Sequence, residues 1–207
     1  SGPLLYVATQ KNIPSLIQEQ NSFPGITNKF LAKRVQSICV AYQHMARYFP
    51  VSKLVLTGNP IRKNLTVQTD SIQSKLSYGF NPSAPVLLIV GGSLGAKRIN
   101  ELIQDKILFF KESNYQILWQ CGELYHSQYR IYDNGSNIRV VDFIKDMSVA
   151  YAAADVIISR AGALAVSELC LVAKPVIFIP SPNVAEDHQT KNAQSLVEAG
   201  AALMIKE

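Results

Sequence analysis

The stretch 154–180, ADVIISRAGALAVSELCLVAKPVIFIP, restricts the possible folds of this chain more than any other. Two short apolar runs, 156–159 and 176–180, flank a helix-forming run that begins after Gly162 and ends at Pro175. A strand, a tight turn, a helix and a second strand in this order are typical of a βαβ unit with parallel strands. The stretch therefore predicts an α/β fold with a parallel sheet.

The same stretch predicts a ligand site at its turn. Ligands of such sheets bind beyond the carboxyl ends of the strands, and Gly162 stands there, before a helix whose free N–H groups attract phosphate. Glu168 shares a helical face with Leu164; its carboxylate would repel phosphate but accept hydrogen bonds from two sugar hydroxyls. Phosphate and diol together indicate a nucleotide or a nucleotide sugar. The alternative, a Gly-broken turn with Glu168 as a solvated surface charge, stays open on this pattern alone.

Composition narrows the class of protein. The chain has 207 residues, 48% of them hydrophobic, which suits one large globular domain or two small ones. Three separated cysteines without CxxC spacing argue against a disulfide framework or a zinc site and fit a reducing cytoplasm. No apolar run approaches the roughly 20 residues of a membrane span. The net charge of +5 suits an anionic ligand or membrane surface, whereas the dispersed basic residues make nucleic acid the least supported partner.

A domain boundary is predicted at Gly58-Asn59-Pro60, where strong turn residues precede a polar segment, 62–70, without a core pattern. Alternating strands and helices are predicted on both sides of it. Besides the two strands of the central stretch, we expect strands at 14–19, 35–42, 53–57, 85–90, 115–120, 137–141 and 201–205. Besides its helix, we expect helices at 4–11, 26–34, 43–49, 70–78, 97–111, 123–132, 146–153 and 187–199.

Three further features are candidate ligand contacts. GGSLGA (91–96) follows a strand and precedes a helix; its glycines allow close approach, and the Ser93 hydroxyl can bond a phosphate oxygen. It is neither GxGxxG nor a P-loop, and a plain βα turn is the alternative. Gln189 follows Asp187, the expected helix cap, and offers a donor and an acceptor to a sugar hydroxyl, or is only first-turn polarity. Arg62 is within reach of a pyrophosphate, or is solvated.

Six motifs follow one another along the chain: EQNSFPGITN (19–28), LTGNPIR (56–62), VGGSLGA (90–96), VVDFIKDM (140–147), the central stretch (154–180) and HQTKNA (188–193). Together they resemble the MurG family of glycosyltransferase family 28. Its members are UDP-N-acetylglucosamine:undecaprenyl-pyrophosphoryl-N-acetylmuramoyl-pentapeptide N-acetylglucosaminyltransferases. The resemblance covers the whole chain and implies a GT-B fold, in which two Rossmann-like domains with parallel sheets face each other across a cleft.

The resemblance also implies a division of the chain. Residues 1–58 would be the C-terminal remnant of the acceptor-binding domain, 59–62 the interdomain linker, and 63–207 the UDP-GlcNAc-binding domain. The first domain would then be truncated, and the family's proposed catalytic base would lie in the missing N-terminal segment. We therefore expect no catalytic residue in this chain, and no turnover by the chain alone, although its parent would be an enzyme.

A set of residues that bind UDP-GlcNAc is implied as well. Ile144 would meet the uracil through backbone and apolar contact, backbone N–H groups at 163–165 would hold the diphosphate, Glu168 would bind the ribose hydroxyls, and Gln189 those of GlcNAc. Ala165 stands where relatives carry Thr, so phosphate contact there relies on the backbone. The full set is Asn21, Arg62, Ser93, Ile144, Ala163, Leu164, Ala165, Val166, Ser167, Glu168 and Gln189.

The implied reaction is an inverting hexosyl transfer in peptidoglycan synthesis. The MurNAc C4 hydroxyl of undecaprenyl-pyrophosphoryl-MurNAc-pentapeptide (lipid I) would attack C1 of GlcNAc, UDP would leave, and lipid II would form. Neither metal nor cofactor is expected, and the leaving-group charge would be stabilised by helix N-termini and Arg62. The implied location is the cytoplasmic face of the bacterial inner membrane, with peripheral contact to its anionic surface.

Other functions stay open on the sequence. A UDP-GlcNAc 2-epimerase-like enzyme would use the same fold, although HQTKNA and GNPIR disfavour it. A nucleotide-sugar binding module without turnover is a second alternative. A nucleic-acid binder is the weakest, because the basic residues are dispersed.

Overall fold

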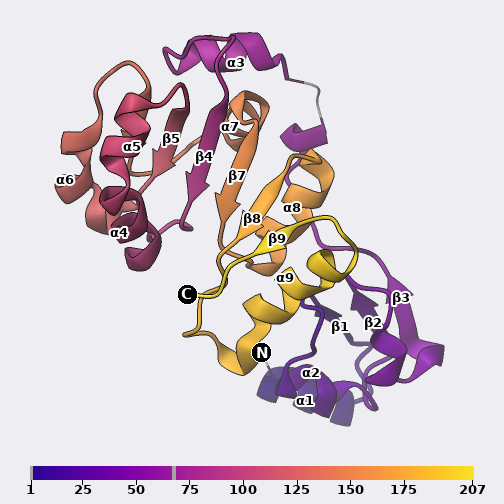
Figure 1. Cartoon of the computed structure of the whole chain (residues 1–207). Helices are drawn as coiled ribbons and strands as arrows, with labels where there is room; N and C mark the ends of the chain where they lie inside the picture. Colours follow the sequence, from indigo (N-terminus) through magenta and orange to yellow (C-terminus); the bar gives the residue numbers. More distant parts are fainter. Residues whose placement is uncertain (1, 67–68) are drawn as a thin grey trace.

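Two parallel sheets run through the computed structural model, which describes residues 2–66 and 69–207 (Figure 1). The first sheet has three strands in the order β1-β2-β3, and the second has six in the order β6-β5-β4-β7-β8-β9. Their hydrogen-bonded strand pairs are all parallel. Parallel neighbours need a crossover connection, usually a helix, so helices alternate with strands as the sequence predicts.

The first sheet and its cover occupy the chain up to residue 56. They consist of α1 (Gly2–Gln10), β1 (Leu16–Glu19), α2 (Ile26–Leu31), β2 (Ser37–Val40) and β3 (Leu54–Leu56). Single 3-10 turns at Met45–Arg47 and Val51–Lys53 connect β2 to β3. Ile17 and Ile38 of the sheet pack with Leu31, Val35 and Phe49 in a small core of their own.

The second sheet is built by regular alternation from β4 onward. Its elements are α3 (Ser71–Ser77), β4 (Val86–Val90), α4 (Lys97–Asp105), α5 (Ile107–Glu112), β5 (Gln116–Gln120), α6 (His126–Tyr129), β6 (Ile138–Val141), α7 (Met147–Ala153), β7 (Val156–Ser159), α8 (Ala163–Val172), β8 (Val176–Phe178), α9 (His188–Glu198) and β9 (Leu203–Met204). None of the helices within 2–66 and 69–207 combines the length and apolar character that crossing a membrane requires.

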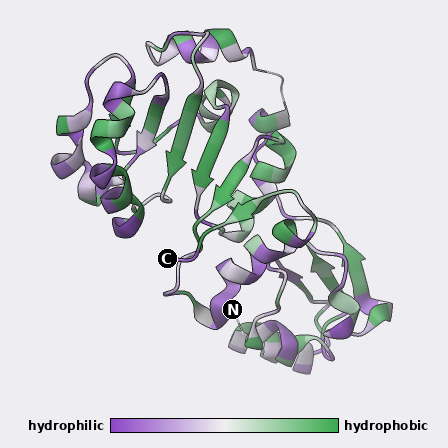
Figure 2. Ribbon diagram, viewed as in Figure 1, coloured by the Kyte–Doolittle hydropathy of each residue, from purple (hydrophilic) through white to green (hydrophobic). Residues whose placement is uncertain are grey.

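Helices cover both faces of the second sheet, because its central strands are apolar on both sides. On β4, Leu88 packs in the core with α7 and α8, whereas its neighbour Ile89 packs on the other face with Ile99 and Ile103 of α4. Trp119 of β5 lies on that second face, fully buried. Figure 2 shows the strands of this sheet as a hydrophobic layer.

Several predicted helices are shorter than expected. The single helix predicted at 97–111 is wrong: it breaks at Lys106, whose N–H bonds to Ile103 O in a tightened last turn and separates α4 from α5. The helix predicted at 123–132 contains only the short α6 between two 3-10 turns. Of the helix predicted at 43–49, only the 3-10 turn Met45–Arg47 forms. Apolar patterning indicates these segments but not how they end.

The predicted linker, 59–62, lies between β3 and the elements of the second sheet. In the polar segment 62–70, residues 63–66 form a 3-10 turn, and residues 67 and 68 lie outside the described part of the chain. α9 lies beside the first sheet's helices (Figure 1), although it precedes β9 of the second sheet. The division into domains 1–58 and 63–207 stays a prediction.

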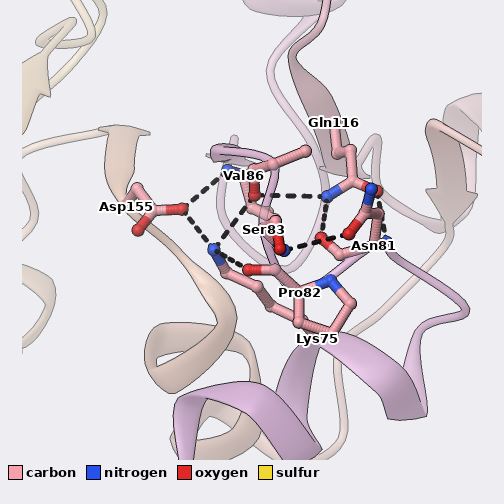
Figure 3. A network of polar contacts seen from close by, with 8 residues as sticks. Lys75, Asn81, Pro82, Ser83, Val86, Gln116 and Asp155 are labelled. Atoms are coloured by element: carbon pink, nitrogen blue, oxygen red, sulfur yellow. Dashed lines mark hydrogen bonds and ion pairs between the residues drawn. The ribbon is translucent and has the colours of Figure 1, made fainter.

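A polar network fastens α3 to the amino-terminal edge of the second sheet (Figure 3). The buried Lys75 Nζ donates to Asp155 Oδ2 at 2.8 Å and to Ala84 O at 3.0 Å. Asp155 Oδ2 also accepts from Val86 N at 2.8 Å. Gln116 exchanges hydrogen bonds with the backbone of Asn81 in the same network. These contacts lie at the amino-terminal ends of β4, β5 and β7. The carboxyl ends of the same strands are at the opposite side of the sheet.

Candidate functional site

A cavity of about 510 Å³ opens at the carboxyl ends of β4 and β5, beside the start of α8. It brings together the predicted site residues Arg62, Ser93, Ile144, Leu164, Ala165 and Glu168. The other lining residues are Pro60, Ile61, Val90, Gly92, Gln120, Phe143, Met147 and Tyr151. The position agrees with the rule that ligands bind beyond the carboxyl ends of parallel strands.

The start of α8 faces this cavity with its polar backbone groups unused. Gly162 is the N-cap, with extended backbone (φ −63°, ψ 148°), and no side chain caps the helix. The N–H groups of Ala163, Leu164 and Ala165 therefore have no acceptor within the helix. Leu164 and Ala165 line the cavity, so an anion there would meet both the N–H groups and the positive end of the helix dipole.

Glu168 is a buried carboxylate in the wall of the cavity, only 7% exposed. Its Oε1 lies 3.2 Å from Arg62 Nε, and its Oε2 accepts from the Tyr151 hydroxyl at 3.5 Å. Burial and the neighbouring Glu168 charge raise the pKa of Tyr151, which keeps its hydroxyl a proton donor. The interpretation of Glu168 as a solvated surface charge is therefore wrong.

The Gly-rich loop after β4 rests against the end of β5. Gly122 has φ +90°, and a Cβ atom on it would lie 2.3 Å from the backbone nitrogen of Gly95. Beneath the loop, the buried Asn100 donates to Cys121 O at 2.8 Å and accepts from Trp119 Nε1 at 2.9 Å. The loop thereby presents Ser93 to the cavity.

Gln120 joins two loops that wall the cavity. Its Nε2 donates to Gly92 O at 3.0 Å, and its Oε1 accepts from Ile144 N at 2.9 Å. Sequence analysis missed this residue. The available signal was a glutamine that follows the apolar run 117–119 at the end of the strand, because a polar side chain in that place needs partners.

All six residues of 163–168 were predicted to contact the donor, but only Leu164, Ala165 and Glu168 line the cavity. Val166 is 2% exposed and packs in the hydrophobic core, so its side chain does not reach the cavity. Ser167 Oγ donates to Ala163 O at 3.0 Å and accepts from Asn59 Nδ2 at 3.0 Å, on the side toward the linker. A helical period explains the division, because 164, 165 and 168 share a face that 166 and 167 do not.

Asn21 and Gln189 lie away from this cavity. Asn21 lines a neighbouring cavity of about 540 Å³ together with Glu19, Asn28 and His188. Gln189 lines neither cavity; its Oε1 accepts from Ser181 N at 3.0 Å and from Ala161 N at 3.3 Å, beside the start of α8.

The expected cap of α9 is wrong. Asp187 stands before the helix but has a left-handed backbone (φ 54°), and its side chain makes no capping hydrogen bond. The last residues before α9 instead form a 3-10 turn, Ala185–Asp187.

Asn192 of α9 connects the loop that carries Asn21, after β1, with the turn before α8. It is fully buried, and its Nδ2 donates to Asn21 Oδ1 at 3.0 Å and to Ala161 O at 3.4 Å. Its Oδ1 accepts from Ser22 N at 2.9 Å. Asn59 Nδ2 makes a parallel connection, to Gln20 O at 2.9 Å and to Ser167. The loop that carries Asn21 is thus bonded to α9 and the linker, and through Asn59 to α8.

Within residues 2–66 and 69–207, no three side chains of His, Cys, Asp or Glu lie close enough together to hold a metal ion. Independence of metal ions and cofactors stays a prediction.

Comparison with known proteins tests the expected family and fold independently. Residues 86–207 match the glycosyltransferase family 28 C-terminal domain. UDP-N-acetylglucosamine--N-acetylmuramyl-(pentapeptide) pyrophosphoryl-undecaprenol N-acetylglucosamine transferases are similar over the whole chain: that of Christiangramia forsetii is 52% identical and that of Flavobacterium psychrophilum 50%. The crystal structure of Acinetobacter baumannii MurG superposes with a TM-score of 0.76 over 99% of this chain, at 33% identity.

The chain spans 57% of the length of the two relatives and 56% of the MurG structure. The superposition confirms the expected α/β fold of GT-B type with parallel sheets. The resemblance to the MurG family is confirmed over the whole of this sequence. The family match, 86–207, covers more than half of the chain and every strand of the second sheet, and the chain belongs to glycosyltransferase family 28.

Proposed function

We propose that the protein of which this chain is part transfers GlcNAc from UDP-GlcNAc to the MurNAc C4 hydroxyl of lipid I, giving lipid II in peptidoglycan synthesis. The names and identities of the curated relatives support the reaction. The observation that carries the proposal is the cavity in which a buried carboxylate, Glu168, lies beside the uncapped start of α8.

The donor is arranged in the cavity by charge and hydrogen bonding. The diphosphate takes the N–H groups at 163–165, and the ribose hydroxyls donate to Glu168. The uracil lies against Ile144 at the far wall. The Glu168–Arg62 contact of 3.2 Å is already formed, so Arg62 turns from the carboxylate toward the diphosphate when the nucleotide enters. Asn21 and Gln189, on the side of the neighbouring cavity, are the proposed contacts of the GlcNAc hydroxyls.

The transfer inverts the configuration at C1. The acceptor hydroxyl forms its bond to C1 of GlcNAc while the bond from C1 to the diphosphate oxygen breaks, and UDP leaves. The negative charge that develops on UDP is stabilised by the first turn of α8, whose N–H groups are already in place, and by Arg62 after it has turned to the diphosphate. No residue of the chain is assigned as the base that takes the acceptor's proton.

Lipid I fixes the proposed place of action, because its undecaprenyl chain lies in the membrane. We propose peripheral contact at the cytoplasmic face of the bacterial inner membrane. The net charge of +5 supports contact with an anionic lipid surface.

Substitution of Glu168 tests the donor site. Glu168→Ala should weaken UDP-GlcNAc binding by about 1–3 kcal/mol, because the ribose loses charge-assisted hydrogen bonds. Isothermal titration calorimetry measures the loss, with Glu112→Ala, at the exposed end of α5, as the control that binds like the parent. An unchanged affinity of Glu168→Ala for UDP-GlcNAc would contradict the assignment of Glu168 to the ribose.

Sugar specificity and turnover need separate measurements. UDP-GlcNAc should raise the melting temperature more than UDP-glucose at equal concentration. An assay with a lipid I analogue, carried out on the protein of which this chain is part, then separates an enzyme from a binding module. A module binds the donor without releasing UDP. Release of free ManNAc would instead reveal an epimerase.

A further inference from the structure

We propose that Gln120 is a positioning residue for the nucleotide: its side chain holds together the two loops between which the UDP part of the donor binds. This inference rests on the proposed function, because it concerns the same cavity. It assigns a role to a residue that neither the motifs nor the resemblance points to.

The contacts of Gln120 show how one side chain serves two loops. Gln120 ends β5 and is only 3% exposed, yet it lines the cavity. Its Nε2 holds Gly92 O at 3.0 Å, immediately before Ser93 in the loop after β4. Its Oε1 holds Ile144 N at 2.9 Å, in the turn after β6. β4 and β6 lie on either side of β5 in the sheet.

Glutamine suits this place because it offers a donor and an acceptor on one uncharged group. Without it, the N–H of Ile144, a residue only 4% exposed, loses its acceptor, which costs free energy. Gly92 O keeps its bond from Gly95 N at 3.0 Å but loses its attachment to β5. Both loops would then sample other conformations, and the nucleotide would have to order them on binding. Gln120 therefore acts through Gly92 and Ile144 rather than by touching the reacting atoms.

The rest of the Gly-rich loop is already fixed from its other side. Gly95 rests directly on Gly122, and Asn100 of α4, the helix after the loop, bonds to Cys121 O and to Trp119 Nε1 at the end of β5. The bond from Gln120 attaches Gly92, which lines the cavity, to the end of β5. Loss of Gln120 should thus disturb the cavity wall without unfolding the sheet.

Gln116 is a matched control on the same strand. It is 4% exposed, and it too binds backbone with both ends of its amide: Oε1 accepts from Asn81 N at 2.6 Å and Nε2 donates to Asn81 O at 2.9 Å. It lies at the amino-terminal edge of the sheet (Figure 3), far from the cavity in the fold. A purely structural effect of losing a buried glutamine should appear in both variants.

The test compares Gln120→Met with Gln116→Met in the whole chain. Calorimetric titration with UDP alone and with UDP-GlcNAc gives the affinities, and thermal unfolding gives the melting temperatures. Gln120→Met should weaken the binding of UDP and of UDP-GlcNAc by the same factor, about tenfold. Gln116→Met should lower the melting temperature as much or more and leave both affinities within about twofold of the parent.

Each outcome decides. The inference is overturned if Gln120→Met binds UDP like the parent, or if Gln116→Met weakens UDP equally. If Gln120→Met does not fold, Gln120→Glu keeps an acceptor for Ile144 N and replaces the donor to Gly92 by a negatively charged oxygen; parent-like UDP binding by that variant also overturns the inference. If the parent binds UDP but does not prefer UDP-GlcNAc to UDP-glucose, the proposed function is contradicted, while the Gln120 comparison stays valid. A parent that does not bind UDP overturns both.

Discussion

At the scale of single residues, the contact between Arg62 and Glu168 shows a site that balances its own charges before a ligand arrives. Glu168 is buried, whereas the Arg62 side chain is 51% exposed. An exposed guanidinium can leave such a pair at small cost, because surface ion pairs contribute little to stability. In the proposed function, the buried carboxylate stays in place to meet the ribose, and the exposed guanidinium becomes available to phosphate.

Arg62→Ala should therefore separate the two halves of the nucleotide. We expect UDP to bind about tenfold more weakly, because a phosphate contact is lost, while uridine binds at least as well as to the parent, because Glu168 no longer has a competitor. Titration with uridine and UDP followed by NMR checks this, with the exposed Arg130→Ala as control. A loss of uridine affinity as large as that of UDP contradicts the assignment.

At the scale of elements, the Lys75–Asp155 contact makes the attachment of α3 to β4 and β7 sensitive to pH. Burial alone would raise the pKa of Asp155, but hydrogen bonds from Lys75 and Val86 outweigh it, so the pKa lies below its ordinary value of 3.8. The folded state then binds this proton more weakly than the unfolded state. The stabilisation is complete above pH 3.8 and is lost as the pH falls through the lower pKa of the folded protein.

Asp155→Asn should remove this part of the acid sensitivity. At neutral pH we expect a cost of no more than about 1 kcal/mol, since the carboxylate is 41% exposed and screened by water. Urea unfolding between neutral pH and pH 3 should show a shallower acid loss than in the parent. Asp105→Asn, at the exposed end of α4, serves as control. Identical slopes for the parent and Asp155→Asn would rule the contact out as the cause.

Elements were predictable where the sequence pattern is local. The apolar runs that became β4 and β7 and the turn at Gly162 are complete within a few residues, so their strands and the start of α8 follow from the sequence. The break at Lys106 depends on how α4 and α5 pack, which no window of the sequence contains. Gln120 was missed for the same reason, because its partners follow β4 and β6 rather than its own strand.

The resemblance placed residues on the site, but not their orientation. It marks 163–168 as one run, whereas the helix turns Val166 into the core and Ser167 toward Asn59. Likewise it sets Asn21 beside the donor, although Asn21 lines the neighbouring cavity and bonds to Asn192.

At the scale of the whole molecule, Asn192 and Asn59 connect the first-sheet region to α8 and α9. Asn192→Leu removes three hydrogen bonds at a fully buried position and leaves Ser22 N without its acceptor. We expect the free energy of unfolding to fall by about 1–3 kcal/mol. Denaturant unfolding measures it, and Gln194→Ala on the exposed face of α9 should stay within about 0.5 kcal/mol of the parent. Equal stability of the two variants would show that Asn192 does not couple the regions.

Both connecting side chains are amides, which neither gain nor lose a proton in the ordinary range of acidity. The hydrogen bonds that these two amides make between the first-sheet region and the second are therefore indifferent to acid, unlike the carboxylate that holds α3. Acidification to below pH 3.8 should loosen α3 from the second sheet, while the hydrogen bonds of Asn192 and Asn59 between the two sheets stay in place.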